Sequence, residues 1–187
     1  LFSDSTNALK PGYTMSEKKI GETLDELIKT ARGRIIIAAF SSLIGRIQQI
    51  INSASYYGRK VFISGRSMAD NISIAQQLQF IKAPPGLIHP INKIGKTKDE
   101  DVLILTTGAQ GEAMSALTRM SLGDHAQILI KRGDTVVLSS SPIPGNERSI
   151  YTVINNIVRL GARVIFNQVM DVHTSGHAQR EDLKLMI

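Results

Sequence analysis

The sequence predicts a three-layer α/β fold in which a mostly parallel sheet is flanked by helices. Short apolar runs rich in β-branched residues alternate with segments of helical periodicity. This alternation continues along the chain without an internal repeat, a low-complexity tract or a linker. A length of 187 residues suits one well-packed domain and is marginal for two. We therefore expect a single domain over residues 1–187.

The first predicted helix begins near Thr14 and ends near Gly33. Thr14 and Glu17 have the spacing of a capping box, and Pro11-Gly12 supplies the turn before it. Four apolar residues recur at helical spacing on one face: Ile20, Leu24, Leu27 and Ile28. This face is expected to pack against the sheet.

Two strand–helix pairs follow. Residues 34–40 form an apolar run typical of a buried strand, and Ser41-Ser42 is positioned to cap the next helix. The apolar stripe of that helix is Leu43, Ile44, Ile47, Ile50 and Ile51. The second pair is a strand over residues 60–64 and a helix over residues 68–81.

The same alternation resumes after a connection at residues 82–101 that is rich in proline and charge. A short strand is expected there near Leu87-Ile88. The remaining strands are predicted at residues 102–106, 135–139 and 162–167, and the remaining helices at residues 112–122, 146–160 and 179–187. The helix at residues 146–160 is expected to bury Ile150, Val153, Ile154, Ile157 and Val158.

Composition excludes several kinds of site. The absence of cysteine excludes disulfides and zinc–thiolate sites. No apolar run is long enough to cross a bilayer, so no membrane partner is expected. A net charge of +6 favours a polyanionic partner, although dispersed charges are equally typical of a solvated surface. The absence of cysteine also fits a reducing cytoplasm. Residues 1–5 include neither an initiator Met nor a signal-peptide pattern, which indicates a piece of a longer protein.

The predicted loops after the strands are rich in Ser, Thr and Gly. They are Ser41-Ser42 and residues 64–67, 106–112, 139–147 and 173–177. In open parallel sheets, ligands bind outside the carboxyl ends of the strands. If the sheet is parallel, these loops share one rim.

Two of these loops could bind an anion. Residues 106–112 could present backbone N–H groups, but they match neither a Walker loop nor a GxGxxG fingerprint, so a capped turn is the favoured interpretation. Ser139, Ser140 and Ser141 leave a strand together, before two prolines that stiffen the loop. Their hydroxyls can donate to phosphate oxygens, and a proline-stiffened turn is the alternative.

The segment HTSGHA at residues 173–178 places two of the four histidines around a Ser-Gly turn. Catalytic zinc normally takes three protein ligands, and the segment contains no HxHxDH or HExxH pattern. A phosphate-binding loop with a histidine as general acid fits better, and a pair of structural histidines is the alternative. Asp4 could orient an imidazole, but an isolated Asp is more often a turn or helix cap.

Taken together, six motifs resemble the β-CASP domain of bacterial ribonuclease J, within the metallo-β-lactamase superfamily. In order along the chain they are DSTNA, PGYTMSE, GRSM, TTGAQGE with SALTRM, SSSPIPGNE and HTSGHA. The resemblance spans essentially the whole chain, and the conserved order makes it specific. It implies a Rossmann-like β-CASP domain of a cytoplasmic RNA-processing and decay enzyme. Such an enzyme has 5′-to-3′ exonuclease and endonuclease activity and uses two zinc ions.

The resemblance also implies site residues. Asp4 matches the acidic motif that supports the catalytic histidine, and His177 matches that histidine, which protonates the leaving oxygen or stabilises the scissile phosphate. The matches to the pocket for the RNA 5′ phosphate are Ser139, Ser140, Ser141, His173, Ser175 and Gly176. Two positions depart from the family pattern, because Ala109 stands where Ser is common and Thr174 where an apolar residue is common.

The family's metallo-β-lactamase half and its third β-CASP histidine have no counterpart in these 187 residues. We therefore predict no metal ligand in this chain, and expect the chain alone to bind no catalytic zinc and to hydrolyse no RNA. The expected partners are 5′-monophosphorylated RNA, the missing metallo-β-lactamase domain and further copies in a homo-oligomer. The alternatives are a freestanding nucleotide- or RNA-binding module without catalytic activity, or a β-CASP nuclease that acts on DNA.

Overall fold

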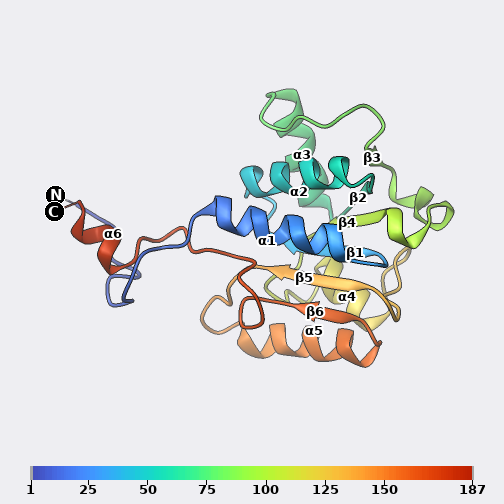
Figure 1. Cartoon of the computed structure of the whole chain (residues 1–187). Coiled ribbons are helices and arrows are strands. Elements are labelled where there is room, and N and C mark those ends of the chain that lie inside the picture. Colours follow the sequence, from blue (N-terminus) through green and yellow to red (C-terminus); the bar gives the residue numbers. More distant parts are fainter. Residues whose placement is uncertain (1, 187) are drawn as a thin grey trace.

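Six parallel strands form the centre of the computed structural model, which describes residues 2–186 (Figure 1). They are β1 (Ile35–Ala39), β2 (Lys60–Ser64), β3 (Ile88–His89), β4 (Val102–Thr106), β5 (Thr135–Ser139) and β6 (Arg163–Ile165). Their order across the sheet is β3-β2-β4-β1-β5-β6, and every pairing is parallel. Every residue of β1, β4 and β5 is buried, as expected for parallel strands covered on both faces.

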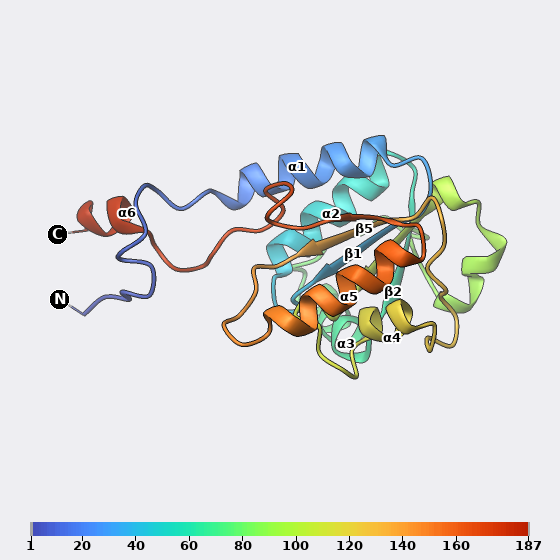
Figure 2. The same cartoon turned by 90° about the horizontal axis from the view of Figure 1, so that it is seen from below.

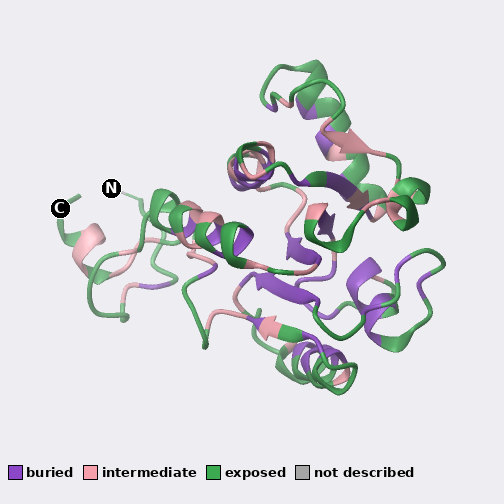
Figure 3. Cartoon of the chain, turned by 45° about the vertical axis from the view of Figure 1, so that its right-hand side comes forward, coloured by how far each residue is buried: buried purple, intermediate pink, exposed green. Residues whose placement is uncertain are grey.

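Helices cover the two faces of this sheet (Figures 1 and 2). They are α1 (Glu17–Thr30), α2 (Ile44–Tyr56) and α3 (Arg66–Gln77) on one face, and α4 (Ala116–Leu122) and α5 (Glu147–Arg159) on the other. Side chains alternate along β1: Ile35 and Ile37 pack with α1 to α3, whereas Ile36 and Ala38 pack with α4 and α5. The purple core in Figure 3 therefore has two halves, one on each side of the sheet. This confirms the predicted three-layer α/β fold.

Several helix boundaries differ from the predictions. The capping box expected at Thr14 does not form, since Ser16 is the N-cap of α1 and accepts a hydrogen bond from the Lys19 N–H. The N-cap of α2 is Leu43, without a side-chain hydrogen bond, so Ser41-Ser42 does not cap that helix. Helix α4 begins only at Ala116, because Ser115 caps it.

The buried face of α5 is narrower than predicted. Ile150, Val153, Ile154 and Ile157 are buried, but Val158 is 55% exposed. Helical geometry explains the difference, because Val158 lies one residue beyond Ile157 and turns away from the sheet. The connection at residues 82–101 holds the short β3 and two 3₁₀ helices, η1 (Ile91–Lys96) and η2 (Asp99–Asp101).

The two chain ends run side by side as an extension of the domain. This terminal extension consists of residues 2–14 and 174–186, and it lies beyond the carboxyl ends of the strands (Figures 1 and 2). A parallel bridge between Asn7 and Gln179 joins its two halves, and helix α6 (Arg180–Lys184) follows. Within residues 2–186, no helix combines the length and the apolar character needed to cross a bilayer.

Candidate active site

The parallel sheet places the Ser-, Thr- and Gly-rich loops along one edge. We call this edge the rim: the loops that follow β1, β2, β4 and β5, together with His173. Its position agrees with the general location of ligand sites in open α/β sheets. Arg66 lies on it as predicted, and lines a crevice with Thr107, Glu112 and Arg119 at the ends of β2 and β4.

Two of the rim loops are locked together by Gln110. Its buried side-chain amide donates to the Ser141 carbonyl at 2.7 Å and accepts from the Ile143 N–H at 2.9 Å. At the neighbouring Gly111, φ is +69°, and a Cβ would lie 2.7 Å from the Ser149 carbonyl carbon. Only glycine suits this close approach, so the loop is built for a fixed geometry.

The three serines after β5 are not equivalent. Ser139 and Ser140 are buried, and their hydroxyls donate to the Val172 and Ala109 carbonyls, each at 2.6 Å. Ser141 is half-buried, and its Oγ accepts from Asn167 at 3.2 Å. No acceptor for the Ser141 hydroxyl proton is found among the described residues, so Ser141 is the best placed of the three to donate to a ligand. Ser139 and Ser140 hold the loop instead.

His173 is half-buried and fixed from several sides. The Arg46 guanidinium, whose side chain has no solvent exposure, donates to His173 Nδ1 at 2.7 Å. The Asn167 side chain accepts from the His173 N–H at 3.0 Å, and the Phe40 ring packs edge-on at 6.2 Å. Burial, and secondly the charge of Arg46, lower the pKa of His173 to about 4, against an opposing effect of Glu17. This imidazole is therefore neutral at physiological pH.

His177 lies in the terminal extension, in a different environment. Its Nδ1 contacts the Asp4 carboxylate, and the two side chains are 52% and 47% exposed. The hydrogen bond from His177, and secondly that from the Thr6 N–H, lower the pKa of Asp4 to about 2. The structure thus brings together two residues from opposite ends of the chain as a carboxylate–imidazole pair.

The residues between the two histidines fix the course of their loop. The Ser175 hydroxyl accepts from the Asn7 amide at 3.0 Å and from the His177 N–H at 3.1 Å. Gly176 is exposed, and within residues 2–186 no atom lies within 4 Å of a Cβ placed on it. Thr174 donates to the Met15 carbonyl at 2.7 Å, which gives a structural reason for a polar residue at this position.

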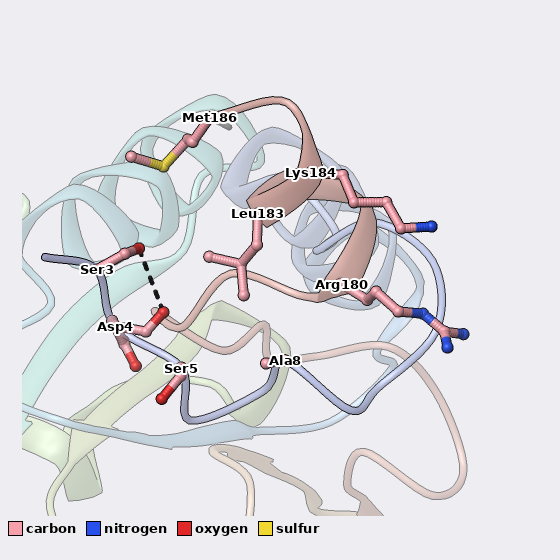
Figure 4. A pocket seen from close by; sticks show the side chains of 8 residues that line it. All are labelled: Ser3, Asp4, Ser5, Ala8, Arg180, Leu183, Lys184 and Met186. Carbon is pink, nitrogen blue, oxygen red and sulfur yellow. Dashed lines mark hydrogen bonds between the residues drawn. The ribbon is translucent and has the colours of Figure 1, made fainter. Parts of the chain in front are cut away.

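A hollow of about 330 Å³ opens beside Asp4 in the terminal extension. Figure 4 shows Leu183 pointing from α6 towards the segment that carries Ser5 and Ala8, with Arg180 and Lys184 pointing outward. Its other lining residues include Ser3, Ser5, Ala8 and Met186. Asp4 of the carboxylate–imidazole pair therefore lines a hollow whose wall is partly apolar.

Within residues 2–186, no group of three or more His, Asp or Glu side chains gathers in a way that could hold an ion. The Nδ1 atoms of both site histidines face protein partners, Arg46 and Asp4, which leaves the Nε2 atom of each ring for a ligand.

Sequence analysis missed four residues that organise the site: Asn7, Arg46, Gln110 and Asn167. A signal was available only for Arg46, which lies three residues after Leu43 on the otherwise apolar stripe of α2. A charged residue in that position needs buried partners. The amides carry no comparable signal, because their partners are distant in sequence.

Comparison with known proteins finds consistent similarity to one family. Residues 32–157 match the family model described as "Ribonuclease J, beta-CASP domain". Ribonuclease J of Thermus thermophilus is 47% identical over 187 residues, which is 100% of this chain and 32% of that protein. Ribonuclease J of Helicobacter pylori J99 is 44% identical, over 100% of this chain and 27% of its own length. For Mycobacterium tuberculosis H37Rv the identity is 46%, over 98% of this chain and 33% of the relative. The chain thus spans about a third of the curated relatives it matches.

Proposed function

This chain belongs to the ribonuclease J β-CASP family, and from that premise we propose that it is the RNA-covering domain of a phosphodiester-hydrolysing ribonuclease. The observation that carries the proposal is the contact between Asp4 and His177. A carboxylate that holds a partly exposed imidazole is a common arrangement for proton transfer. The net charge of +6 supports a polyanionic substrate.

His177 is proposed to give a proton to the leaving oxygen of the RNA. The Asp4 carboxylate can only accept from His177 Nδ1, because it is ionised at neutral pH. Nε2 is then the ring nitrogen available to the substrate. Proton transfer by a positioned side chain contributes about 10²–10⁴-fold to a reaction rate.

The rim is proposed to bind the 5′ phosphate of the RNA. Ser141 offers a hydroxyl, and His173 offers a neutral ring on the same rim. Ser139 and Ser140 support this pocket by fixing its loop, while Ser175 and Gly176 lead from it to His177. Binding of a 5′ phosphate beside a proton-transferring group favours 5′-to-3′ exonuclease action, and internal cleavage would need RNA to pass the rim.

The rest of the intact protein is proposed to contain the metallo-β-lactamase domain and both zinc ions. A zinc centre there would supply an activated water as nucleophile. We further propose a cytoplasmic homo-oligomer for the intact enzyme. The chain alone is proposed to be inactive, because it holds the proton donor but no site for that metal.

The test is hydrolysis of 5′-monophosphorylated RNA by an intact ribonuclease that contains this chain. Wild type should hydrolyse the RNA, and His177→Ala should lose most of the turnover. DNA of the same sequence, also 5′-phosphorylated, should be a poor substrate. Retained turnover in His177→Ala would refute the proton-transfer role, and preferred hydrolysis of the DNA would refute the RNA assignment.

The isolated chain supplies the second arm of this test. It should hydrolyse neither substrate and bind no stoichiometric zinc in metal analysis. Two zinc ions per isolated chain would contradict the proposal that their ligands lie elsewhere.

A further inference from the structure

One buried guanidinium connects three elements at the rim. Arg46 donates through Nε to Glu17 at 3.2 Å and through Nη1 to the Ser139 carbonyl and to His173 Nδ1, at 3.2 Å and 2.7 Å. A further hydrogen bond runs from Nη2 to Glu17. The start of α1, the end of β5 and the HTSGHA segment are thereby held on one planar group of α2.

This contact determines the protonation of the histidine ring. A guanidinium only donates hydrogen bonds, so His173 Nδ1 must accept and cannot carry a proton. A neutral imidazole then carries its proton on Nε2. His177 differs in this respect, because its Nδ1 faces a carboxylate that only accepts, so this nitrogen carries a proton.

We propose that Arg46 is a positioning residue that locks His173 as a neutral Nε2–H imidazole. His173 then serves as a fixed hydrogen-bond donor and takes no part in proton transfer. That the acceptor is a 5′ phosphate rests on the proposed function. The locked ring itself rests only on the contacts of the chain.

The charged groups around His173 support this assignment. Arg46 approaches from α2 and Glu17 from α1, and Phe40 contributes an uncharged surface. A hydrogen bond with the Ser139 backbone raises the pKa of His173, but its effect is smaller than those of burial and Arg46. Glu17 is itself bonded to Arg46, which reduces its attraction for a proton on the imidazole. Burial and the nearest cation both oppose the imidazolium form.

Nitrogen NMR of the histidine rings in this chain tests the proposal directly. In wild type near neutral pH, His173 should show an unprotonated Nδ1 and a protonated Nε2. In Arg46→Met, which removes the donor but keeps an apolar side chain, His173 should become a mixture of tautomers and titrate closer to its ordinary value. A proton on Nδ1 in wild type, or an unchanged Nε2–H ring in the variant, would overturn the proposal.

His125 is an internal control for this measurement. Its Nδ1 accepts from the Gln127 and Ile128 N–H groups at 3.3 Å and 3.1 Å, so it carries the same tautomer without Arg46. Its signals should remain unchanged in Arg46→Met if the variant keeps its fold. Should the variant fail to fold, the wild-type tautomer of His173 alone decides.

RNA hydrolysis by the intact ribonuclease supplies a second readout. Loss of one well-placed hydrogen-bond donor should raise KM for 5′-monophosphorylated RNA roughly tenfold in Arg46→Met and leave KM for 5′-hydroxyl RNA nearly unchanged. Arg34→Met is the matched control, because Arg34 is a second buried arginine, paired with Asp134 at the opposite end of β1. It should leave the ratio of the two KM values as in wild type. An equal ratio in all three proteins would exclude a role of Arg46 in 5′-phosphate binding.

The two proposals can fail separately. A locked His173 in an enzyme without preference for a 5′ phosphate would contradict the proposed function and leave the role of Arg46 intact. A His173 ring that is not held as the Nε2–H tautomer, in an enzyme that prefers a 5′ phosphate, would contradict the role of Arg46 and leave the proposed function intact.

Discussion

The rim and the terminal extension each contain one histidine of the same short loop, but the surroundings of the two imidazoles differ in burial and in the charge of the neighbouring group. His173 is half-buried beside a cation, and burial holds its pKa at about 4. His177 is 52% exposed beside a carboxylate. The comparison shows that two histidines of one short motif can lie in very different environments, and that burial keeps the imidazole of His173 neutral at physiological pH.

The ion pairs of the two regions differ in the same way. Arg34 and Asp134 form a two-bonded pair at 2.6 Å and 2.8 Å in the body of the domain, with side-chain exposures of 11% and 1%. Asp4 and His177 form theirs near solvent. The body of the domain therefore keeps its ion pair away from water, whereas the pair in the extension is open to solvent.

The largest expected effect separates the two histidines by kinetics. His177→Ala should lower kcat about 10²–10⁴-fold, because it removes the proton donor. His173→Ala should mainly raise KM for 5′-monophosphorylated RNA. Steady-state hydrolysis by the intact ribonuclease measures both parameters. An equal loss of kcat in the two variants would contradict the different roles of the two histidines.

A second variant sharpens the difference in stability. Asp134→Ala leaves Arg34 as an unpaired buried charge and should lower the free energy of unfolding by about 3–5 kcal/mol. The control is Asp99→Ala, which breaks the half-exposed pair with Lys131 and should cost less than about 1 kcal/mol. Urea denaturation of the isolated chain measures both, and equal losses would contradict the contrast.

The link between two rim loops should have a smaller effect. Gln110→Ala leaves the Ser141 carbonyl and the Ile143 N–H without their partner, and should cost about 1–3 kcal/mol of unfolding free energy. Gln76→Ala, at an exposed position of α3, should change it by less than about 0.5 kcal/mol. A Gln110→Ala protein as stable as the control would show that the rim is not held by this side chain.

The smallest expected effect is a titration in the extension. The Asp4 carboxyl should have a pKa of about 2 in the chain, and its pKa should move back towards 3.8 in His177→Ala. Because the folded value is depressed, the pair stabilises the fold above the ordinary pKa and loses this contribution as pH falls towards about 2. Carbon NMR of the carboxyl group measures the pKa of Asp4. An identical Asp4 titration in both proteins would contradict its pairing with His177.

Most of the fold could be predicted because its signals are local. The strands at residues 60–64, 102–106 and 135–139 have the predicted bounds, since each is a short apolar run between polar turns. Helix starts were harder, as Thr14 shows: its hydroxyl donates to the His177 carbonyl and accepts from the Gln179 N–H. No local pattern could show that a residue with capping-box spacing is bonded to the other end of the chain.

In the candidate site, too, contacts between distant segments could not be predicted from local patterns. Asp4 and His177 could be paired only through the motif resemblance, because 173 positions separate them in sequence. Their contact becomes visible only when the two ends lie side by side. The partners of Arg46 could not be predicted for another reason, since they come from α1, β5 and the HTSGHA segment at once.

The loop between the two histidines also sets a length. Four residues of fully extended chain span at most about 14 Å, so the backbones of His173 and His177 cannot lie further apart than this. If His173 binds the 5′ phosphate and His177 acts at the scissile bond, the loop between them limits the length of the released product. Residues 174–176 would then determine the distance from the 5′ phosphate to the cleaved bond. An insertion that lengthens this segment should lengthen the oligonucleotide released from the 5′ end.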